Sequence, residues 1–318
     1  MKDFENLFND ESCSENEKAK IKVIAVGGSG TMVANLLEGQ KNIDVYLINS
    51  DSASLKKSKV QNKILIGNIG LGCGGNIERA KEYAKSSINE FKDILKDTDV
   101  VFITTGLGGG TGSAIAPIIA KLAKDLGILS ISIVTKPFAV EGKERIENAN
   151  IGVKELKKYT GALIVVPNDT ILPLMDSKSE YEKGFEMVDD IIRIMIESVV
   201  DMLTKQNPIN IDFADIRNII DDSKEVFLAI GGGNNIEEAF DNAIKDNFTE
   251  NEKNILDANK IIMNIEYADE KDLYIGDIRK IYDKVHTMFN FFKSFKMGHN
   301  KNNNLVSKIK VTILASIK

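Results

Sequence analysis

The chain has 318 residues, with 41 Lys and Arg against 47 Asp and Glu, a formal net charge of -6 and 43% hydrophobic residues. This length fits one large domain or two ordinary ones, and the composition is that of a folded globular chain. The acidic balance excludes a protein that mainly coats nucleic acid or anionic lipid, because both need clustered Lys and Arg. We therefore expect no direct binding to nucleic acid.

No apolar run approaches the roughly 20 residues that cross a bilayer, and the N-terminus lacks the apolar core and cleavage site of a signal peptide. We expect a cytoplasmic protein with no inserted membrane segment. Cys13, Cys73, His286 and His299 are the only cysteines and histidines. They form no close pair or cluster, so we expect neither a structural zinc site nor a disulfide framework.

Residues 1–20 are acidic and polar and predict a mobile N-terminal tail. Beyond them, short apolar runs alternate with helix-like segments, which lie at 31–40, 76–96, 113–126 and 142–158. The apolar runs are β-branched and bounded by Gly, Pro, Asn or Asp, as buried parallel strands are; they cover 21–26, 44–50, 62–67, 99–105, 128–135 and 162–167. The alternation predicts an α/β fold with a doubly wound parallel sheet over 21–178, whose ligand lies at the carboxyl ends of the strands.

Residues 180–204 predict a long helix with a broad apolar face near the 3.6-residue period. Pro208 is a helix stop that follows it. Strand-like runs at 226–231, 260–267 and 308–317 then frame helices near 236–246 and 274–287, and the Asn/Lys stretch 298–304 is interpreted as a surface hairpin loop. We therefore expect four parts: a tail (1–20), the large α/β domain (21–178), a central helix (179–205) and a smaller α/β domain (206–318).

Glycine-rich segments follow two of the predicted strands and open helices: GGSGT at 27–31 and GLGGGTGS at 106–113. A third, GLGCGG at 70–75, could close over the same ligand. Glycines let backbone N–H groups approach phosphate oxygens, and a helix N-terminus adds positive partial charge. Each segment alone is also compatible with a tight turn that binds nothing. Three of them at the ends of successive strands favour a phosphate site.

A Rossmann dinucleotide site is the main rival interpretation. Gly28 and Gly30 begin its fingerprint, and Asp51 ends the next strand where a ribose-binding acid belongs. However, Val33 occupies the position of the third glycine, and a nicotinamide site does not explain the GGGTG run at 108–112. A Walker A motif is also excluded, because no Gly-Lys-Ser/Thr follows any of these loops.

The run GGGTGSAIAP at 108–117 resembles the signature of the tubulin/FtsZ family, and the chain is more similar to the FtsZ branch than to the tubulins. The resemblance extends from about residue 21 to the end in the family's order, through INSD (48–51), LGCGGN (71–76), VTKPFAVEGKER (134–145), VPND (166–169) and NIDFADIR (210–217). It implies a GTPase with a GTP-binding domain over 21–178 and a C-terminal domain over 206–318. It also implies a homopolymer of head-to-tail filaments, in which the next subunit completes the GTP site.

The resemblance implies a GTP or GDP site made of the glycine loops and a few side chains. The phosphate loops then supply Gly27, Gly28, Ser29, Gly30, Thr31, Gly74, Gly108, Gly109, Gly110, Thr111, Gly112 and Ser113. Met32 stands where the family usually has an Asn that lines the base, so it forfeits a polar contact.

Base and ribose contacts are implied for five further residues. Glu141 holds the ribose, and Arg145 lies by the sugar and phosphates; without the resemblance they would be an exposed i,i+4 ion pair. Asn168 belongs to the nucleotide side of the PND motif. Phe185 packs on the guanine or, in the simpler interpretation, in the core. Asp189 reads the guanine edge, because a carboxylate accepts from both N1–H and the 2-amino group.

The family assigns Asn210, Asp212 and Asp215 to the nucleotide of the neighbouring subunit, where the acids polarise the attacking water. Mg²⁺ on the β and γ phosphate oxygens neutralises charge. The two acids alone are equally typical of helix-capping residues. Because neither half-site is sufficient, the resemblance implies GTP hydrolysis only on assembly.

The resemblance implies a role in bacterial or archaeal cell division, with a ring at midcell. The alternatives are a related filament that segregates plasmid or phage DNA or modulates another FtsZ, and, remotely, a Rossmann-type dinucleotide enzyme. The family's usual C-terminal peptide for membrane-tethered adaptors is not found before Lys318. We therefore expect any division or adaptor protein to be recruited by another route.

Overall fold

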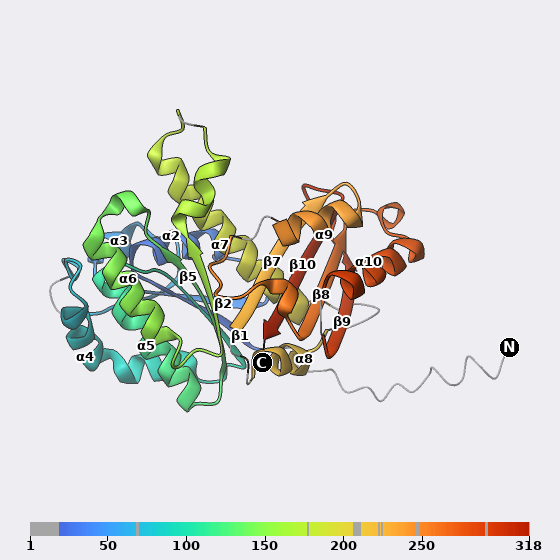
Figure 1. Ribbon diagram of the computed structural model, residues 1–318. Helices are drawn as coiled ribbons and strands as arrows, with labels where there is room; N and C mark the ends of the chain where they lie inside the picture. Colours follow the sequence, from blue (N-terminus) through green and yellow to red (C-terminus); the bar gives the residue numbers. More distant parts are fainter. Residues whose placement is uncertain are drawn as a thin grey trace.

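The computed structural model describes residues 19–67, 70–176, 178–205, 211–221, 223, 225–245, 248–289 and 292–317. Its larger sheet has six parallel strands in the order β3-β2-β1-β4-β5-β6 (Figure 1). They are β1 Ile21–Val26, β2 Ile43–Asn49, β3 Asn62–Leu65, β4 Val100–Gly106, β5 Leu129–Lys136 and β6 Ala162–Pro167. The six apolar runs of the sequence therefore all form strands, and the predicted parallel sheet is confirmed.

Helices cover both faces of this sheet, and they are α2 Gly27–Leu37, α3 Ser52–Lys57, α4 Ile77–Leu95, α5 Gly110–Asp125 and α6 Lys143–Leu156. The buried faces of α4, α5 and α6 form one core cluster with the sheet, whereas those of α2 and α3 belong to the cluster on the other face. Helices α2 and α5 begin three or four residues earlier than the sequence predicts, at Gly27 and Gly110. The first glycine-rich segment and the second half of the second one thus form first helical turns, whereas residues 70–75 lie outside helices.

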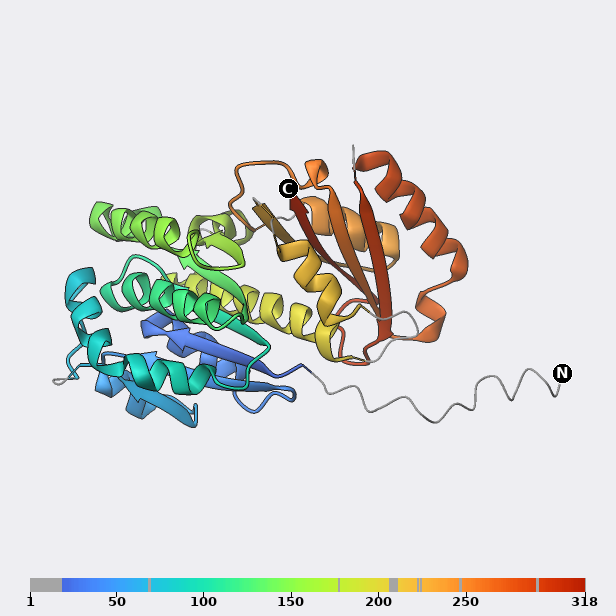
Figure 2. The same cartoon turned by 90° about the horizontal axis from the view of Figure 1, so that it is seen from below.

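The predicted central helix is α7, Tyr181–Thr204, and it is followed by α8, Phe213–Ile220. Helix α7 lies between the two sheets (Figures 1 and 2). Its residues Val188, Ile192, Ile196 and Val199 share one buried cluster with strands of the large sheet and with Leu228, Ile262 and Leu314 of the small sheet. A single apolar core therefore joins the two sheets through this helix.

The smaller sheet contains β7 Glu225–Gly233, β10 Ile309–Ile317, β8 Lys260–Tyr267 and β9 Ser294–Lys301, in that order. Strand β10 is antiparallel to both neighbours, and β8 is parallel to β9. Helices α9 Ile236–Lys245 and α10 Ile275–Met288 pack with its core. The interpretation of 298–304 as a hairpin loop is wrong for residues 298–301, because they belong to β9 and pair with residues 264–267 of β8.

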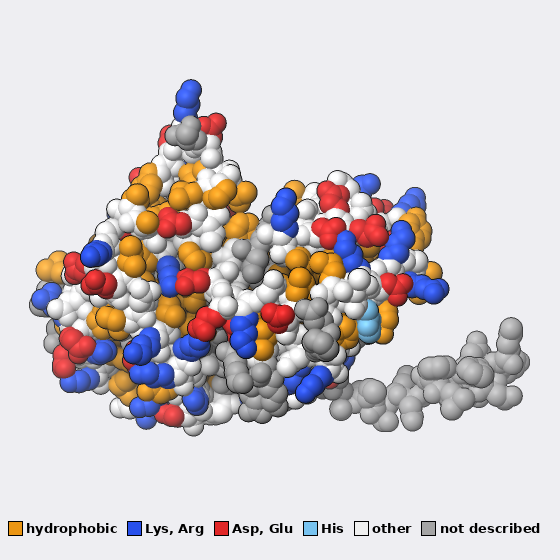
Figure 3. Space-filling view, in the orientation of Figure 1, with side chains coloured by type: hydrophobic (Ala, Val, Ile, Leu, Met, Phe, Trp, Pro, Cys, Tyr) orange, Lys and Arg blue, Asp and Glu red, His pale blue; other side chains and the backbone are white. Residues whose placement is uncertain are grey.

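The surface is a mixture of apolar and charged side chains of both signs, as Figure 3 shows for one face. None of the helices in the described part of the chain combines the length and apolar composition that crossing a membrane requires.

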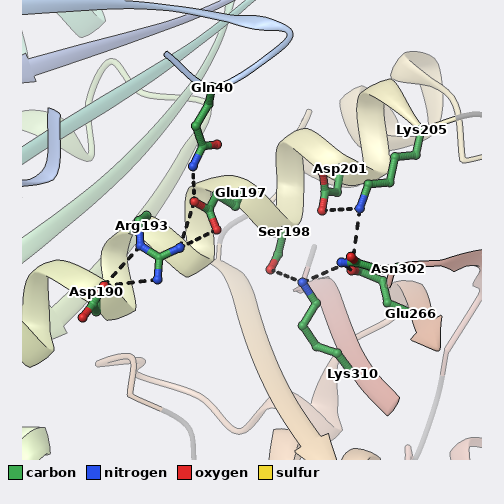
Figure 4. A network of polar contacts seen from close by, with 10 residues as sticks. All are labelled: Gln40, Asp190, Arg193, Glu197, Ser198, Asp201, Lys205, Glu266, Asn302 and Lys310. Atoms are coloured by element: carbon green, nitrogen blue, oxygen red, sulfur yellow. Dashed lines mark hydrogen bonds and ion pairs between the residues drawn. The ribbon is translucent and has the colours of Figure 1, made fainter. Parts of the chain in front are cut away.

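A polar network fixes α7 to the elements on either side of it (Figure 4). Arg193 pairs with Asp190 and Glu197 on the same helix, and Glu197 also accepts a hydrogen bond from Gln40. Ser198, the next residue of α7 after Glu197, lies 3.3 Å from Lys310 of β10. Lys310 in turn lies 2.8 Å from the fully buried Glu266 of β8. These contacts determine how the central helix meets the smaller sheet.

Candidate nucleotide site

A cavity of about 440 Å³ opens at the carboxyl ends of the parallel strands. It is bounded by the first turns of α2 and α5, by residues 49–51 after β2, by residues 72–75 and by one face of α7. The cavity lies at the sheet edge where α/β folds bind ligands. Its volume falls in the range of small-molecule sites.

Helices α2 and α5 both begin at this cavity without a side-chain cap. Their N-cap residues, Val26 and Gly109, make no side-chain hydrogen bond to the first turn. Asp51 and Asn76, in contrast, cap α3 and α4 by accepting hydrogen bonds from backbone N–H groups. The first turns of α2 and α5 therefore direct backbone donors and positive partial charge at the cavity, as an anion site requires.

The backbone at these two turns requires glycine at two positions. Gly27 has a φ of +76°, which side chains disfavour, and a Cβ placed there would make an ordinary contact of 3.5 Å with the backbone nitrogen of Gly112. A Cβ on Gly112 would lie 2.2 Å from Oγ1 of Thr105 in β4. Gly27 therefore provides the turn into α2, Gly112 lets α5 lie directly on β4, and the two first turns lie against each other.

Most of the predicted nucleotide residues line the cavity: Gly27, Gly28, Ser29, Met32, Gly74, Gly109, Gly110, Thr111, Gly112, Glu141, Arg145, Asn168, Phe185 and Asp189. Gly30, Thr31, Gly108 and Ser113 are not among the lining residues. Thr31 Oγ1 donates to the Gly27 carbonyl oxygen at 2.8 Å, and the Gly108 N–H donates to Ser113 Oγ at 2.9 Å. These two hydroxyls hold the loops in shape from behind.

Aromatic rings and unsatisfied polar groups lie together at the α7 side of the cavity. Phe185 packs edge-on against Phe138 and Tyr181, with ring centroids 5.1 Å apart in both pairs. Phe185 therefore combines core packing with a surface open to the cavity. Nearby, Asn168 is 5% exposed, and its Oδ1 has no hydrogen-bond partner within the described chain. A buried acceptor without a partner is costly unless a ligand satisfies it.

Asp189 is a buried acid that lines the same part of the cavity and is only 6% exposed. Burial, reinforced by the negative charges of Asp190 and Glu186, raises its pKa to about 7. A ligand that offers two N–H donors to this carboxylate would offset the cost of its burial. Asp189 thus has the environment of a ligand-binding residue.

Glu141 and Arg145 form the expected i,i+4 ion pair, and they do so at the rim of the cavity. Glu141 also accepts a hydrogen bond of 2.8 Å from the Phe138 N–H. The carboxyl side chain is 9% exposed, whereas the guanidinium side chain is 55% exposed. Glu141 is therefore rigidly placed, and Arg145 can reach an anion in the cavity.

Asp212 and Asp215 lie at the start of α8, away from this cavity. They form a capping box: each side chain accepts a hydrogen bond from the backbone N–H of the other, at 2.8 and 2.9 Å. Asp215 also pairs with Lys296 of β9. Burial on its own would raise the pKa of Asp215, but the hydrogen bonds from Lys296 and Asp212 lower it overall. Asn210 lies outside the described residues.

The comparisons with known proteins agree on one family. Residues 20–176 match the family model described as the tubulin/FtsZ family GTPase domain. The chain is 34% identical over 319 residues to the cell division protein FtsZ of Buchnera aphidicola, an alignment that covers 95% of this chain and 80% of the relative.

The chain belongs to the tubulin/FtsZ family of GTPases.

Solved structures support this placement. The empty FtsZ dimer of M. jannaschii superposes with a TM-score of 0.86 at 30% identity, over 99% of this chain and 91% of the other. A GTPγS-bound CetZ2 protofilament from Haloferax volcanii gives a TM-score of 0.75 at 19% identity, with 93% and 92% coverage. At that identity the second likeness concerns the fold alone.

The charges around the cavity are those of a site that binds phosphate through its backbone. Asp51, Glu141 and Asp189 are the acidic lining residues, and Arg145 is the basic one. A triphosphate here would therefore depend on the N–H groups of the two helix N-termini and on a divalent cation. The described residues contain no group of three His, Cys, Asp or Glu that could hold a metal, so the phosphates and water would supply most of the ligands of Mg²⁺.

Several lining residues were not predicted as site residues. Ser50 Oγ lies 2.8 Å from Thr111 Oγ1 and accepts from Cys73 Sγ at 3.3 Å, so the end of β2 is tied to both glycine segments. Asn49 donates to Thr31 Oγ1, and Thr135, the last residue but one of β5, lines the cavity. Their signal in the sequence is polar residues at the carboxyl ends of buried strands, a position that the parallel sheet brings to one edge.

Proposed function

We propose that the chain is a self-assembling cytoskeletal GTPase, active in the cytoplasm in cell division, and that its head-to-tail filaments hydrolyse GTP between subunits. One observation carries this proposal. The nucleotide cavity is lined by Phe185 and Asp189 near the start of α7, whereas α8, which begins after Asp212, follows the other end of α7. Figure 1 shows α8 below α7, next to the small sheet. Arg217 of α8 donates to the carbonyl oxygen of Gly127, which precedes β5 at the sheet edge opposite the cavity, so Asp212 lies far from a nucleotide held in its own subunit.

In this proposal the cavity binds the whole nucleotide. The uncapped first turns of α2 and α5 hold the phosphates. Asp189 and Asn168 bind the polar edge of the guanine, and the Phe185 ring packs against the base. Glu141 binds the ribose, and Arg145 lies against the phosphates. The support for these roles is that a ligand would satisfy two buried polar groups at once, the Asn168 Oδ1 and the Asp189 carboxylate.

Hydrolysis in this proposal requires the α8 end of the next subunit. Mg²⁺, when bound with the nucleotide, would neutralise charge on the phosphates held at the first turns of α2 and α5. Asp212 is exposed and presents a carboxylate that orients and polarises a water molecule next to the neighbour's γ-phosphate. Asp215, held by Lys296 and by the Asp212 N–H, stays ionised and fixes the position of Asp212. The same capping box that starts α8 thus preorganises the acids.

The first test is the dependence of turnover on protein concentration. The purified chain should retain guanine nucleotide, and its GTPase rate per subunit should rise steeply where sedimentation shows assembly. A rate per subunit that stays constant through that concentration would contradict hydrolysis between subunits.

For the division role, a fluorescent fusion in the native cell should form a ring at midcell. Filaments that instead follow a plasmid or phage DNA would favour a segregation role.

A further inference from the structure

A second cavity, of about 650 Å³, lies on the outer side of the large sheet between α4, α5 and α6. We call it the α4–α5 groove. Its floor is apolar and consists of Ile77, Ala84, Ile88, Pro117, Ile118 and Leu122. Ile88, Ile118 and Leu122 are only half-buried and lie against the core cluster beneath, so the groove is an open edge of that core.

Lysines surround this apolar floor. Lys81, Lys85, Lys92 and Lys121 line the groove, against two acids, Asp125 and Glu155. Within the described part of the chain, neither Lys92 nor Lys121 has a carboxylate partner; Lys121 lies over the Tyr159 ring. Figure 3 shows blue side chains interspersed with orange ones over this region. An apolar groove with a basic rim fits an acidic segment that also carries apolar anchors.

The chain itself contains a segment of this composition ahead of the described residues. Residues 1–18 contain two lysines against six acids, a net charge of -4, and carry Phe4, Leu7 and Phe8 at helical spacing. The sequence of this segment therefore has negative charge to complement the rim lysines and apolar residues to match the apolar floor.

The described chain begins near the end of α4, the helix whose Lys92 lines the groove. Ala19 borders the same hollow as Asp93 and Lys96 at the end of α4, and the Lys20 N–H donates to Asp99 at 2.8 Å. From Phe8 to Ala19 the chain can span up to about 36 Å, whereas α4 from Ile77 to Lys92 is about 22 Å long. Every part of the groove is within reach of Phe8.

We propose that residues 1–18 dock in the α4–α5 groove of their own subunit. Phe4, Leu7 and Phe8 cover the apolar floor formed by Ile88, Ile118 and Leu122, and the acids face the lysines of the rim. Because the segment is tethered at Ala19, its effective concentration at the groove is high, and weak contacts suffice for docking.

Cys13 provides a probe for this docking in the full chain, because Cys73 is buried. In a Lys85→Cys variant, a short bismaleimide should link Cys13 to the groove within one monomer. A Lys57→Cys variant, with the new thiol at the exposed end of α3, is the matched control position. We expect the link at position 85 to form at least about 5-fold more readily than at position 57.

The decisive comparison keeps the tether and removes the anchors. Replacing Phe4, Leu7 and Phe8 by Ser should lower the yield at position 85 by about 5-fold without changing the charge. A yield that this triple variant leaves unchanged would show that the tether alone brings the thiols together, and would overturn the proposal. Cross-linking only at the mass of a dimer would also overturn it, because the groove would then hold a second copy.

Discussion

Two buried carboxylates beside the central helix have opposite environments. Asp189 is 6% exposed and has no cation beside it, and its pKa is raised to about 7. Glu266 is completely buried, and burial on its own would raise its pKa as well. Lys310 at 2.8 Å, Asn302 at 2.5 Å and Lys205 at 3.8 Å instead lower it (Figure 4). Burial alone therefore does not determine the state of either acid.

In the proposed function this difference separates a binding residue from a structural one. Glu266 is paired with Lys310 and Lys205 of the protein itself, so this acid joins α7 to the small sheet without a ligand. Asp189 has no such cation in the described chain, and Asn168 Oδ1 has no hydrogen-bond partner there. Other buried polar atoms also lack a partner, so it is the position of Asp189 and Asn168 on the cavity wall that marks a ligand site.

The largest effect is expected at the paired carboxylate. Glu266→Ala leaves the largely buried Lys310 without its acid, whereas Lys205 keeps Asp201, so the change should lower the free energy of unfolding by about 3–5 kcal/mol. Chemical denaturation at pH 7 measures this change. Glu252→Ala is the matched control, because the Glu252–Lys157 pair is exposed and should contribute far less to the free energy of unfolding. Equal losses of unfolding free energy in Glu266→Ala and Glu252→Ala would mean that burial of the Glu266 ion pair adds nothing to stability.

The lowered pKa of Glu266 also predicts the pH range in which this stabilisation disappears. Its pKa in the folded state is lowered, so the stabilisation is complete above the ordinary Glu pKa of 4.5 and is lost as pH falls through the lower folded value. The difference in free energy of unfolding between the native chain and Glu266→Gln, measured by chemical denaturation, should therefore shrink below pH 4.5. A difference that persists at lower pH would mean that the charge of Glu266 is not its source.

Removing the charge of Asp189 should stabilise the protein, whereas removing that of Glu266 should destabilise it. Asp189→Asn should weaken GTP binding by about 1.5–3 kcal/mol, because the amide cannot accept both donors of guanine. The same change should stabilise the nucleotide-free protein above pH 7, where the buried carboxylate is ionised, and have little effect near pH 4, where it is protonated. Titration with GTP and ATP, with unfolding curves at both pH values, tests both statements. A destabilised variant with unchanged GTP affinity would reverse our assignment.

A smaller effect is expected on the pH dependence of GTP binding. Asp189 must be ionised to accept from guanine, and half of it is protonated at about pH 7 in the free protein. GTP should therefore bind about 10-fold more weakly at pH 6 than at pH 8. In Asp189→Asn this difference should vanish. The same change of GTP affinity with pH in both proteins would indicate that another group titrates.

The smallest effect is expected at Met32, which lines the cavity but is 52% exposed. Met32→Asn restores the polar contact that the family usually makes and should tighten GDP binding roughly 2- to 5-fold, as one partly exposed hydrogen bond does. Leu36→Asn is the control, since Leu36 is 43% exposed one turn further along α2 and outside the cavity. Tighter binding in both variants would show a general effect of polarity.

The sequence was sufficient for the parallel sheet and for the glycine cradle, because both depend on local patterns: buried β-branched runs and glycines at their ends. It was not sufficient for β9, whose residues 294–301 mix Ser, Lys, His and Asn and form an edge strand only by pairing with β8. Nor could it reveal the pair between Asp215 and Lys296, which are 81 residues apart. This contact exists only once α8 has packed against the small sheet.

The two interpretations of Asp212, as a helix cap and as a catalytic acid, are separated by a conservative variant. The structure confirms that Asp212 caps α8. Asn caps helices as well as Asp does, so Asp212→Asn keeps the capping function and removes the charge. In the proposed function this variant should bind GTP and assemble but lose turnover by at least ~100-fold.

Mixing two inactive variants tests hydrolysis between subunits most directly. Asp212→Asn retains an intact cavity, and Arg145→Ala retains intact acids at the other end. In a filament assembled from equal amounts, about one junction in four joins an intact cavity to intact acids, because a head-to-tail interface uses two different surfaces. The GTPase rate of the mixture should therefore recover to about one quarter of the rate of the native chain, while each variant alone stays near zero. A mixture no more active than its separate components would contradict hydrolysis across the interface, and full activity of Asp212→Asn alone would leave Asp212 with its capping role only.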